Sequence, residues 1–470
     1  MDERIKKRKR WIIHTAGALL LAFLVLAVYI GYVQVIESED LISSPYNRRY
    51  ATHAGKGRIL DRNGIVLAET DADGRRQYPY GAVFSHVVGY NEPEAGSAGV
   101  ESSMADALVG KGALRNFGPL RNLFTEGRGS DVVLTLDAPL QETIYNAIGD
   151  RKGAAIVMDA STGKVLAMVS KPSYDPRGVS ANWDALRDAA ESPLLNRAAQ
   201  GLYPPGSVIK PMIADAALTD GKTNADEIFH CDGVLQVGSE SIRESHGAVH
   251  GDVHLADAVA ESCNVAFSTL ALRLGADGLE KAFHRFGFDA VPDGLDFIAA
   301  APVLPAFHTL SDIDTALVGI GQSTLLVTPL SMLLLEDAFA NRGKIMKPQI
   351  IERIVTSRGL AVNAGRAEVW MQPTTEAGAE IIDRYMLDAV RKGTGGRAEI
   401  ANVRVTGKTG TAETGSGQDH AWFIGSAEYG AEKIVFVVLV ENGGGGGRVA
   451  APIAKEIIET WMENRGDRRA

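Results

Sequence analysis

The sequence contains only two cysteines, Cys231 and Cys263, among its 470 residues. This excludes a disulfide framework and a four-cysteine zinc site, and the separation of the two thiols does not fit the close pair of a zinc finger. Acidic residues outnumber basic ones by 58 to 48, and the net charge of −10 argues against a general nucleic-acid binder. The apolar share of 45% excludes disordered and collagen-like chains. We expect no metal and no cofactor.

Long apolar runs are scarce, and a single run reaches the length of a membrane-spanning helix. Residues 11–36 contain no Asp, Glu, Lys or Arg, and a helix of this length rises about 39 Å, against a hydrocarbon core of about 30 Å. Six basic residues lie within residues 1–10, before this run. The positive-inside rule predicts a cytoplasmic tail at 1–10, a transmembrane anchor at 11–36 and the rest of the chain outside the cytoplasm. A cleaved signal peptide and a buried soluble helix are the alternatives.

The remaining sequence divides into a loop-rich segment, residues 37–136, and a longer segment, residues 137–470, with strand and helix patterns. Apolar runs predict two early and three late strands, at 154–158, 165–169, 403–406, 421–425 and 434–440. A mostly helical stretch separates the two groups. We therefore expect an α+β or layered fold, in which one sheet is built from both ends of a long segment.

Local signals indicate where several helices begin and end. Asp137 is placed to cap a helix over the next turns. Thr328 followed by Pro329 is typical of a helix start, and the same helix is expected to end near Gly343. Residues 442–447 are almost all glycine and predict a flexible loop before an amphipathic C-terminal helix.

The pattern Ser-x-x-Lys occurs at Ser161–Lys164 and at Ser207–Lys210. The first copy falls in a predicted hairpin turn, where Ser161 is expected to be a turn residue. The second copy opens a helical run, and residues three apart share a helix face, so the Lys210 amine can reach the Ser207 hydroxyl. A serine nucleophile needs an adjacent base, and lysine acts as one only when neutral, a state that burial and a helix N-terminus favour. The alternative is that Ser207 simply caps the helix.

The pattern Ser-x-Asn also occurs twice. Ser180–Asn182 lies in a polar stretch and is expected to be a loop or a cap. Ser262-Cys-Asn264 lies between two helical runs, where a second hydroxyl could relay a proton to a leaving amine and the amide could hold a substrate carbonyl. A helix–turn–helix corner with a capping Asn is the alternative for this copy.

The run Lys408-Thr409-Gly410-Thr411 lies at the end of the apolar run at 403–406, and we therefore expect it on a strand. A strand edge offers backbone N–H groups to an oxyanion, and Gly410 allows a close approach. Thr409 and Thr411 offer hydroxyls for a carboxylate, while Lys408 supplies positive charge. Taken alone, such a run is explained by chance in a chain with 51 glycines.

The order of the three motifs is more specific than any one of them. Ser262 lies 55 residues after Ser207 (262 − 207), and Lys408 lies 146 residues further (408 − 262). This is the signature order of penicillin-interactive serine enzymes. The sequence resembles the class B penicillin-binding proteins, the monofunctional D,D-transpeptidases of peptidoglycan synthesis, from about residue 56 to 461. Residues 56–64 are similar to the family's N-terminal motif, with Lys56 in place of its first Arg. Further family-like segments are residues 99–101, 131–137, 319–322, 328–330, 393–395 and 421–425.

The resemblance implies a penicillin-binding serine-transpeptidase fold, with a five-stranded antiparallel sheet between helical layers. Ser207 would be the acylated nucleophile and Lys210 its base. Ser262 and Lys408 would shuttle the proton, and Asn264 would hold the stem peptide. Each of these roles is carried over from the family's motifs.

The oxyanion hole would consist of the backbone N–H groups of Ser207 and Thr411. Residues 37–136 would form a small dimerisation or pedestal-like domain, because only 70 residues separate Asp61 from Asp131 (131 − 61) and large members carry a longer pedestal there. Such a short member is expected to pair with a membrane-embedded glycan polymerase of the SEDS type. The expected ligands are peptidoglycan stem peptides, lipid-linked precursors and β-lactams, with no nucleic acid.

Three other functions are compatible with the same motifs. A serine β-lactamase shares the acylation step but hydrolyses the acyl-enzyme quickly. A D-Ala-D-Ala carboxypeptidase transfers the acyl group to water. A non-catalytic β-lactam sensor or scaffold would not need the intact Ser207, Lys210 and Lys408. For the two cysteines, separate thiols are favoured over a Cys231–Cys263 disulfide.

Overall fold

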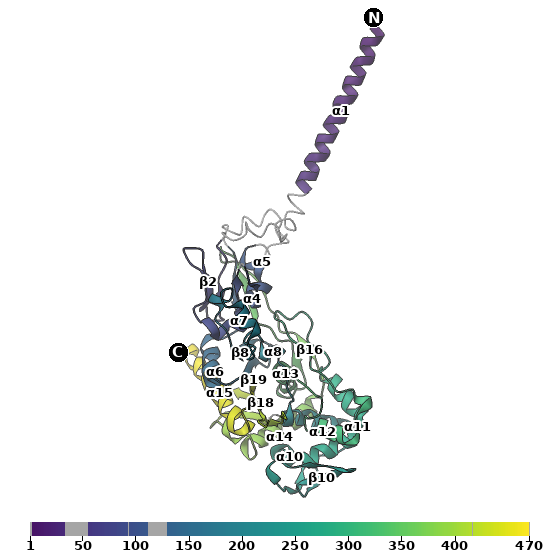
Figure 1. Cartoon of the computed structure of the whole chain (residues 1–470), viewed down its shortest axis with the longest axis vertical. Coiled ribbons are helices and arrows are strands. Elements are labelled where there is room, and N and C mark those ends of the chain that lie inside the picture. Colours follow the sequence, from purple (N-terminus) through teal and green to yellow (C-terminus); the bar gives the residue numbers. More distant parts are fainter. Residues whose placement is uncertain (1, 33–54, 93, 111–128, 416, 470) are drawn as a thin grey trace.

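The computed structural model describes residues 2–32, 55–92, 94–110, 129–415 and 417–469. The first described segment is one helix, α1 (Asp2–Tyr32), drawn in purple in Figure 1. Its stretch Ile13–Ile30 has a mean hydropathy of 2.3 and is not buried against any other part of the structure. By length and composition this stretch is a candidate membrane span. Residues 11–32 of the predicted anchor lie in α1. Residues 33–36 of the prediction lie outside the part of the chain that the structure describes.

A five-stranded antiparallel sheet forms the centre of the larger part of the chain, in the order β17-β18-β19-β7-β8. The early strands are β7 (Gly153–Asp159) and β8 (Val165–Lys171). The late strands are β17 (Arg404–Ala412), β18 (His420–Tyr429) and β19 (Glu432–Val440). Both predicted groups therefore join one sheet through the pairing of β19 with β7. This confirms the predicted arrangement.

Helices cover both faces of this sheet. On one face lie α6 (Ala138–Ile148) and the C-terminal helix α15 (Gly446–Arg469). On the other face lie α9 (Lys210–Thr219) and α13 (Pro329–Ala340), and α11 (Asn264–Arg285) packs against α9. Figure 1 shows α6 and α15 together on one flank of the sheet and α13 on the other. The predicted layering is confirmed.

Alternation along the strands explains why the sheet has two apolar faces. Successive side chains of a strand point to opposite faces. On β7, Ile156 and Met158 pack into the core under α9 and α13, whereas Ala155 and Val157 pack into the core under α6 and α15. Every one of these four side chains is fully buried.

Two predicted helix starts are confirmed, and one boundary is wrong. Asp137 accepts a hydrogen bond from the Leu140 N–H at the start of α6, and Thr328 forms a capping box at the start of α13. The loop predicted at 442–447 is shorter than expected, because α15 already begins at Gly446. The backbone of Gly446 packs so closely against β17 that a Cβ there would lie 2.4 Å from the Gly410 carbonyl oxygen. Close packing, which composition does not reveal, orders this glycine.

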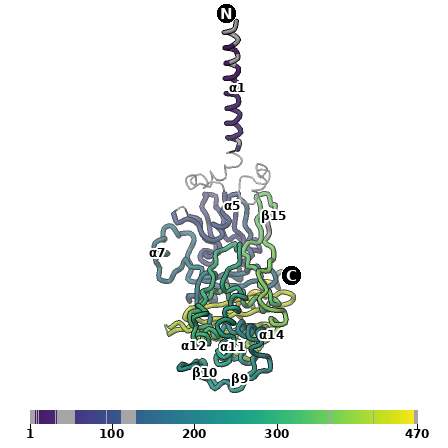
Figure 2. Tube along the Cα trace, turned by 90° about the vertical axis from the view of Figure 1, so that its right-hand side faces the viewer, coloured from purple at the N-terminus to yellow at the C-terminus, as the bar shows by residue number. Residues whose placement is uncertain are grey.

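A second, six-stranded sheet holds the N-terminal part, in the order β15-β14-β6-β1-β2-β3. Its strand β1 (Ile59–Leu60) pairs in parallel with β6 (Asp131–Leu134). The next strands of the sheet, β14 (Ile351–Val355) and β15 (Ala361–Ala364), come from the middle of the chain. The loop-rich segment predicted at 37–136 thus completes its sheet with residues from further along the sequence. In Figure 2, β15 and α5 (Ala105–Leu108) lie together at the end of the body nearest α1.

Asp61 connects this sheet to the larger part. It is fully buried, and its carboxylate accepts hydrogen bonds from the N–H groups of Asn63 and Ile65, and from the N–H of Ala138 at 3.1 Å. The same carboxylate therefore closes a turn and meets the first turn of α6. This contact gives a structural reason for the acidic residue in the motif at residues 56–64.

Smaller elements complete the described chain. Two short two-stranded antiparallel sheets lie at the end of the body farthest from α1, where Figure 1 labels β10 and Figure 2 labels β9 and β10. They pair β9 (Ile228–Cys231) with β12 (Gly251–His254), and β10 (Val234–Val237) with β11 (Glu240–Arg243). The remaining principal elements are β2 (Val66–Thr70), β3 (Arg76–Gln77), α7 (Trp183–Asp188), α10 (Leu255–Ala260), α12 (Asp312–Val318), β16 (Val369–Met371) and α14 (Glu376–Arg391).

Candidate active site

Ser207 and Lys210 lie where a short 3₁₀ turn, Gly206–Ile209, passes into helix α9. Ser207 is half-buried, whereas Lys210 is fully buried. Burial lowers the pKa of Lys210 to about 8, although the nearby Glu244 and Cys263 act in the opposite direction. With a pKa of about 8, the amine one turn from the candidate nucleophile has a neutral fraction that reaches one half near pH 8 and can act as a general base.

The Lys210 amine connects the first motif to the second. Its Nζ donates to the backbone carbonyl of Ser262 at 2.6 Å, lies 3.2 Å from the Ser262 hydroxyl and is 2.8 Å from Asn264 Oδ1. Sequence spacing led us to expect Lys210 close to Ser207. The tertiary fold adds that the same amine contacts both polar residues of the second motif.

The second motif forms a sharp corner between α10 and α11. Ser262 has a φ of +62°, a left-handed conformation that is costly for a residue with a side chain and that is concentrated at functional sites. Cys263 caps α11 by accepting from the Ala266 N–H, so the alternative in which Asn264 caps the helix is wrong. Asn264 is instead free to use its Oδ1 for Lys210 and its Nδ2 for the carbonyl of Arg243.

The third motif lies on β17, the edge strand of the five-stranded sheet. The strand passes directly against the turn that carries Ser207. A Cβ at Gly206, where φ is +57°, would lie 2.7 Å from the Thr411 carbonyl oxygen, and a Cβ at Gly410 would lie 2.9 Å from Val208 Cγ1. Glycine at both positions therefore allows the backbone of β17 to approach the turn Gly206–Ile209. As a result, the exposed Thr411 comes close to Ser207.

Lys408 is the second buried lysine of the site. Burial lowers its pKa well below the usual value, the charge of Lys210 lowers it further, and Glu261 partly opposes both effects. Because a positive charge on one amine disfavours a positive charge on the other, the state in which only one of the two amines is protonated is favoured over the state in which both are. The Lys408 amine lies 3.2 Å from the Thr409 carbonyl oxygen, whereas the Thr409 hydroxyl is 2.6 Å from that of Thr394. Lys408 is consequently better suited to proton transfer than to presenting a charge at the surface.

The other two motif copies have structural roles. The Ser161 hydroxyl donates to Asp159 Oδ1 at 2.7 Å and closes the turn between β7 and β8, which confirms that Ser161 is a turn residue. The partner in its motif, Lys164, pairs with Glu352. Ser180 approaches Glu92 in a short polar segment. The alternative copies therefore do not reach the site.

Sequence reasoning missed the residues that support the site from behind. Glu244 lies beside Lys210 and accepts from the Val265 N–H at 2.8 Å. On the other side of the nucleophile turn, Glu441 pairs with Arg197 at 2.7 Å and accepts from the Tyr203 hydroxyl at the same distance. The partners are separated by up to 244 positions in sequence, so no local pattern indicates them.

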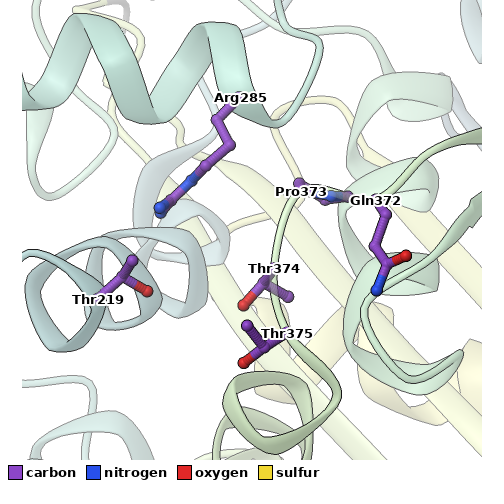
Figure 3. Close-up of a pocket in the computed structure, with 6 residues that line it drawn as sticks. All are labelled: Thr219, Arg285, Gln372, Pro373, Thr374 and Thr375. Atoms are coloured by element: carbon purple, nitrogen blue, oxygen red, sulfur yellow. The ribbon is translucent and has the colours of Figure 1, made fainter.

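A cavity of about 320 Å³ lies apart from the three motifs. Figure 3 shows side chains of two helices and of the segment before α14 around it. Its lining residues are Thr219, Arg285, Gln372, Pro373, Thr374 and Thr375. Thr219 is the last residue of α9, whereas Lys210 is the first. The cavity therefore lies at the opposite end of α9 from Lys210 and is not part of the site that contains Ser207 and Lys210.

Comparison with known proteins agrees with this architecture. The penicillin binding protein transpeptidase domain model matches residues 153–459, and the penicillin binding protein A dimerisation domain model matches residues 56–132. The chain therefore belongs to the penicillin-binding protein transpeptidase family. This confirms the resemblance found from the motifs and the expected fold.

Several members of this family are similar over most of the chain. Peptidoglycan D,D-transpeptidase PbpA of Mycobacterium tuberculosis is 32% identical, over 92% of this chain and 94% of that protein. Peptidoglycan D,D-transpeptidase MrdA of Acinetobacter baumannii is 30% identical, over 83% and 66% respectively. Among solved structures, a ceftriaxone acyl-enzyme complex of penicillin-binding protein A from M. tuberculosis has a TM-score of 0.81 at 29% identity, over 87% of this chain and 99% of that one. The D,D-transpeptidase domain of a peptidoglycan glycosyltransferase from Eggerthella lenta has a TM-score of 0.80 at 31% identity, over 88% of this chain and 99% of that one.

Replacement of Lys408 tests its contribution to proton transfer. Lys408→Ala is expected to slow acylation by fluorescent penicillin by a factor on the order of 10², the lower range for a general acid–base group. Thr409→Val, which loses one hydroxyl hydrogen bond, is expected to cost about tenfold or less. Stopped-flow acylation rates give both values. A wild-type rate for Lys408→Ala would rule out a role for this amine in proton transfer during acylation.

Proposed function

We propose that this chain is a peptidoglycan D,D-transpeptidase that cross-links stem peptides through an acyl-serine intermediate and is acylated by β-lactams. The observation that carries the proposal is the contact of one buried amine, Lys210, with both Ser262 and Asn264, one turn from Ser207. The lowered pKa of this amine and its contact with a second hydroxyl support the roles of Lys210 as base and of Ser262 in the proton relay. The names of the similar proteins given above support the same activity.

In the first half of the reaction, Ser207 Oγ attacks the carbonyl carbon of the penultimate D-Ala, and its proton passes to neutral Lys210. The negative charge that develops on the carbonyl oxygen is stabilised by the N–H groups of Ser207 and Thr411, which the close packing of Gly206 against β17 brings near each other. The peptide bond then breaks, and the leaving D-Ala amine takes a proton relayed through Ser262 and Lys408. An acyl-serine remains.

In the second half, the amine of another stem peptide attacks the acyl-serine. Lys210 and the relay accept a proton from the attacking amine and return one to Ser207 Oγ, so the enzyme is regenerated and a new peptide bond is formed. Asn264 is proposed to hold the stem peptide. The hydroxyls of Thr409 and Thr411 would bind the terminal carboxylate, Thr411 from an exposed position on the strand edge.

The cellular setting is part of the same proposal. With α1 as anchor and its basic residues on the cytoplasmic side, the catalytic part would lie outside the cytoplasm, where peptidoglycan is cross-linked. Residues 37–136 would form the dimerisation or pedestal-like domain, followed by the transpeptidase domain at 137–470. A membrane-embedded glycan polymerase of the SEDS type is proposed as the partner that supplies new strands.

The experiment that tests this function is a product analysis. The full-length chain in detergent is incubated with a synthetic donor peptide ending in D-Ala-D-Ala and with an excess of an acceptor amine. We expect mass spectrometry to show the cross-linked product in excess over the donor shortened by hydrolysis. The penicillin adduct is expected to be long-lived under the same conditions.

The alternatives give different products. A donor that is only shortened, whatever the acceptor concentration, would identify a carboxypeptidase instead. Rapid release of hydrolysed penicillin would identify a β-lactamase. Stable penicillin binding with no turnover of any donor peptide would favour a sensor or scaffold.

A further inference from the structure

Glu261 lies between the end of α10 and the corner that carries the second motif. Its N–H donates to the Asp257 carbonyl at 2.8 Å, which closes the last turn of α10, and Ser262 follows it directly. Its side chain is exposed and forms no ion pair or side-chain hydrogen bond with any residue that the structure describes. Lys392, which reaches α10 from α14, is engaged instead by Asp257 at 3.2 Å and by Asp388 at 3.4 Å. The Glu261 carboxylate is therefore available to a ligand.

The backbone on each side of Glu261 is attached to the catalytic motifs. Before it, the Ala260 carbonyl accepts from the Thr394 N–H at 3.2 Å, and the Thr394 hydroxyl contacts the third motif. After it, the Ser262 carbonyl accepts from the Lys210 amine at 2.6 Å. These contacts hold Glu261 in one place, between the second and third motifs.

The charge of Glu261 reaches the proton relay. It acts to raise the pKa of the buried Lys408, against the larger effects of burial and of the charge on Lys210. The site thus has two buried amines inside it and one exposed carboxylate beside them. An exposed carboxylate attracts a cationic group that approaches from solvent, and salt screens this attraction.

The proposed reaction brings such a cation to this side of the site. The leaving D-Ala amine takes its proton through Ser262 and Lys408, and the acceptor amine follows the same path in reverse, so it enters beside Ser262. A primary alkyl amine has a pKa close to that of a lysine side chain, about 10.4, and is an ammonium ion at neutral pH. The acceptor therefore arrives next to Glu261 as a cation.

We propose that Glu261 recognises the ammonium group of the acceptor stem peptide and so favours an amine over water as the acceptor. This inference rests on the proposed transpeptidase function. The ammonium group pairs with the carboxylate, releases one proton to solvent and attacks the acyl carbon as a neutral amine. Its second proton passes through the relay to Ser207 Oγ, so the ester bond breaks as the peptide bond forms. Glu261 determines specificity and carries no proton in these steps.

The test is a kinetic comparison of acceptors. The full-length chain in detergent is incubated with a synthetic donor peptide ending in D-Ala-D-Ala and with rising concentrations of a peptide that has one free primary amine. The ion pair forms before the attack, so its loss should raise the KM for the acceptor and leave kcat within about twofold. Glu261→Gln is expected to raise this KM about twofold to fivefold, the range of one exposed ion pair. Glu261→Lys should raise it further, because repulsion replaces attraction.

Two controls separate the charge of Glu261 from a general effect on the site. Asp277→Asn removes an exposed carboxylate from α11, 13 residues after Asn264 (277 − 264), and should keep the wild-type KM. The acceptor peptide with a hydroxyl in place of its amine, used as a competitor, should have the same inhibition constant for the wild type and Glu261→Gln. Added salt should raise the KM of the wild type toward that of Glu261→Gln and change the variant little.

The outcomes distinguish this inference from the function on which it rests. Cross-linked product with the same acceptor KM in the wild type, Glu261→Gln and Glu261→Lys would overturn the role of Glu261 alone. So would an equal loss of affinity for the hydroxyl competitor, which would indicate a structural effect. A wild type that forms no cross-linked product at any acceptor concentration would overturn the transpeptidase function and this inference with it.

Discussion

Ser207→Ala is expected to abolish the covalent penicillin adduct completely, because Ser207 is the proposed nucleophile, one turn from the buried Lys210 whose pKa is lowered. The hydroxyl that is lost is the atom that would form the ester bond, and its loss leaves Lys210 with no proton to accept. Intact-mass spectrometry after incubation with penicillin, followed by peptide mapping, measures the effect. The wild-type adduct should map to Ser207.

The chain provides its own matched control for this variant. Ser161 belongs to the same Ser-x-x-Lys pattern, but its hydroxyl is bonded to Asp159 in the β7–β8 turn. Ser161→Ala should therefore be labelled as fully as the wild type. An adduct on Ser161, or undiminished labelling of Ser207→Ala, would show that the wrong motif has been assigned.

Lys210→Ala is expected to slow acylation by a factor on the order of 10³, within the range for loss of a general base. Lys210 is the amine one turn from Ser207, and its contacts with Ser262 and Asn264 link the nucleophile to the proton relay. Lys164→Ala, which removes the lysine of the other motif copy and its ion pair with Glu352, is the matched control and should acylate normally. Comparison of melting temperatures separates a chemical effect from unfolding.

The pH dependence gives an independent measure of the same residue. Burial lowers the pKa of Lys210 to about 8, and the neutral amine that accepts the Ser207 proton predominates above that pKa. The acylation rate of the wild type should therefore rise with pH and level off above pH of about 8. The residual rate of Lys210→Ala should lack this rise. A wild-type rate that is flat between pH 6 and 9 would mean that some other group is the base.

The periodicity of the sequence was sufficient to predict the central sheet. The two early and three late apolar runs became β7, β8, β17, β18 and β19, because strands buried on both faces are continuous apolar segments that turn residues separate clearly. The strand lengths were underestimated. The residues from Lys408 to Thr411 are small or polar and do not extend the apolar run, but they lie on β17 as expected and pair with β18 along their whole length.

The site could be predicted only as a set of separate motifs. Sequence spacing indicated that Ser207 and Lys210 share a turn, since local geometry follows from helix periodicity. It gave no physical basis for expecting Lys210 to contact Ser262 and Asn264, more than 50 residues away. The resemblance to a known family supplied that expectation, and the roles of the individual residues stay predictions until the variants are measured.

Other features depend on long-range packing alone. The N-terminal sheet takes β14 and β15 from the middle of the chain, and Glu441 reaches back to Tyr203 beside the nucleophile turn. Both cysteines are free and buried, as expected, and the tertiary fold brings them close to Glu244 and His250. Local propensity and periodicity act over a few turns of chain, so the sequence by itself determined the apolar N-terminal helix, the strands and the serine–lysine turn. The tertiary structure decided which of these segments contact one another. Both apolar faces of the sheet are removed from water, and the charged groups between the helices find partners, only when distant segments pack together.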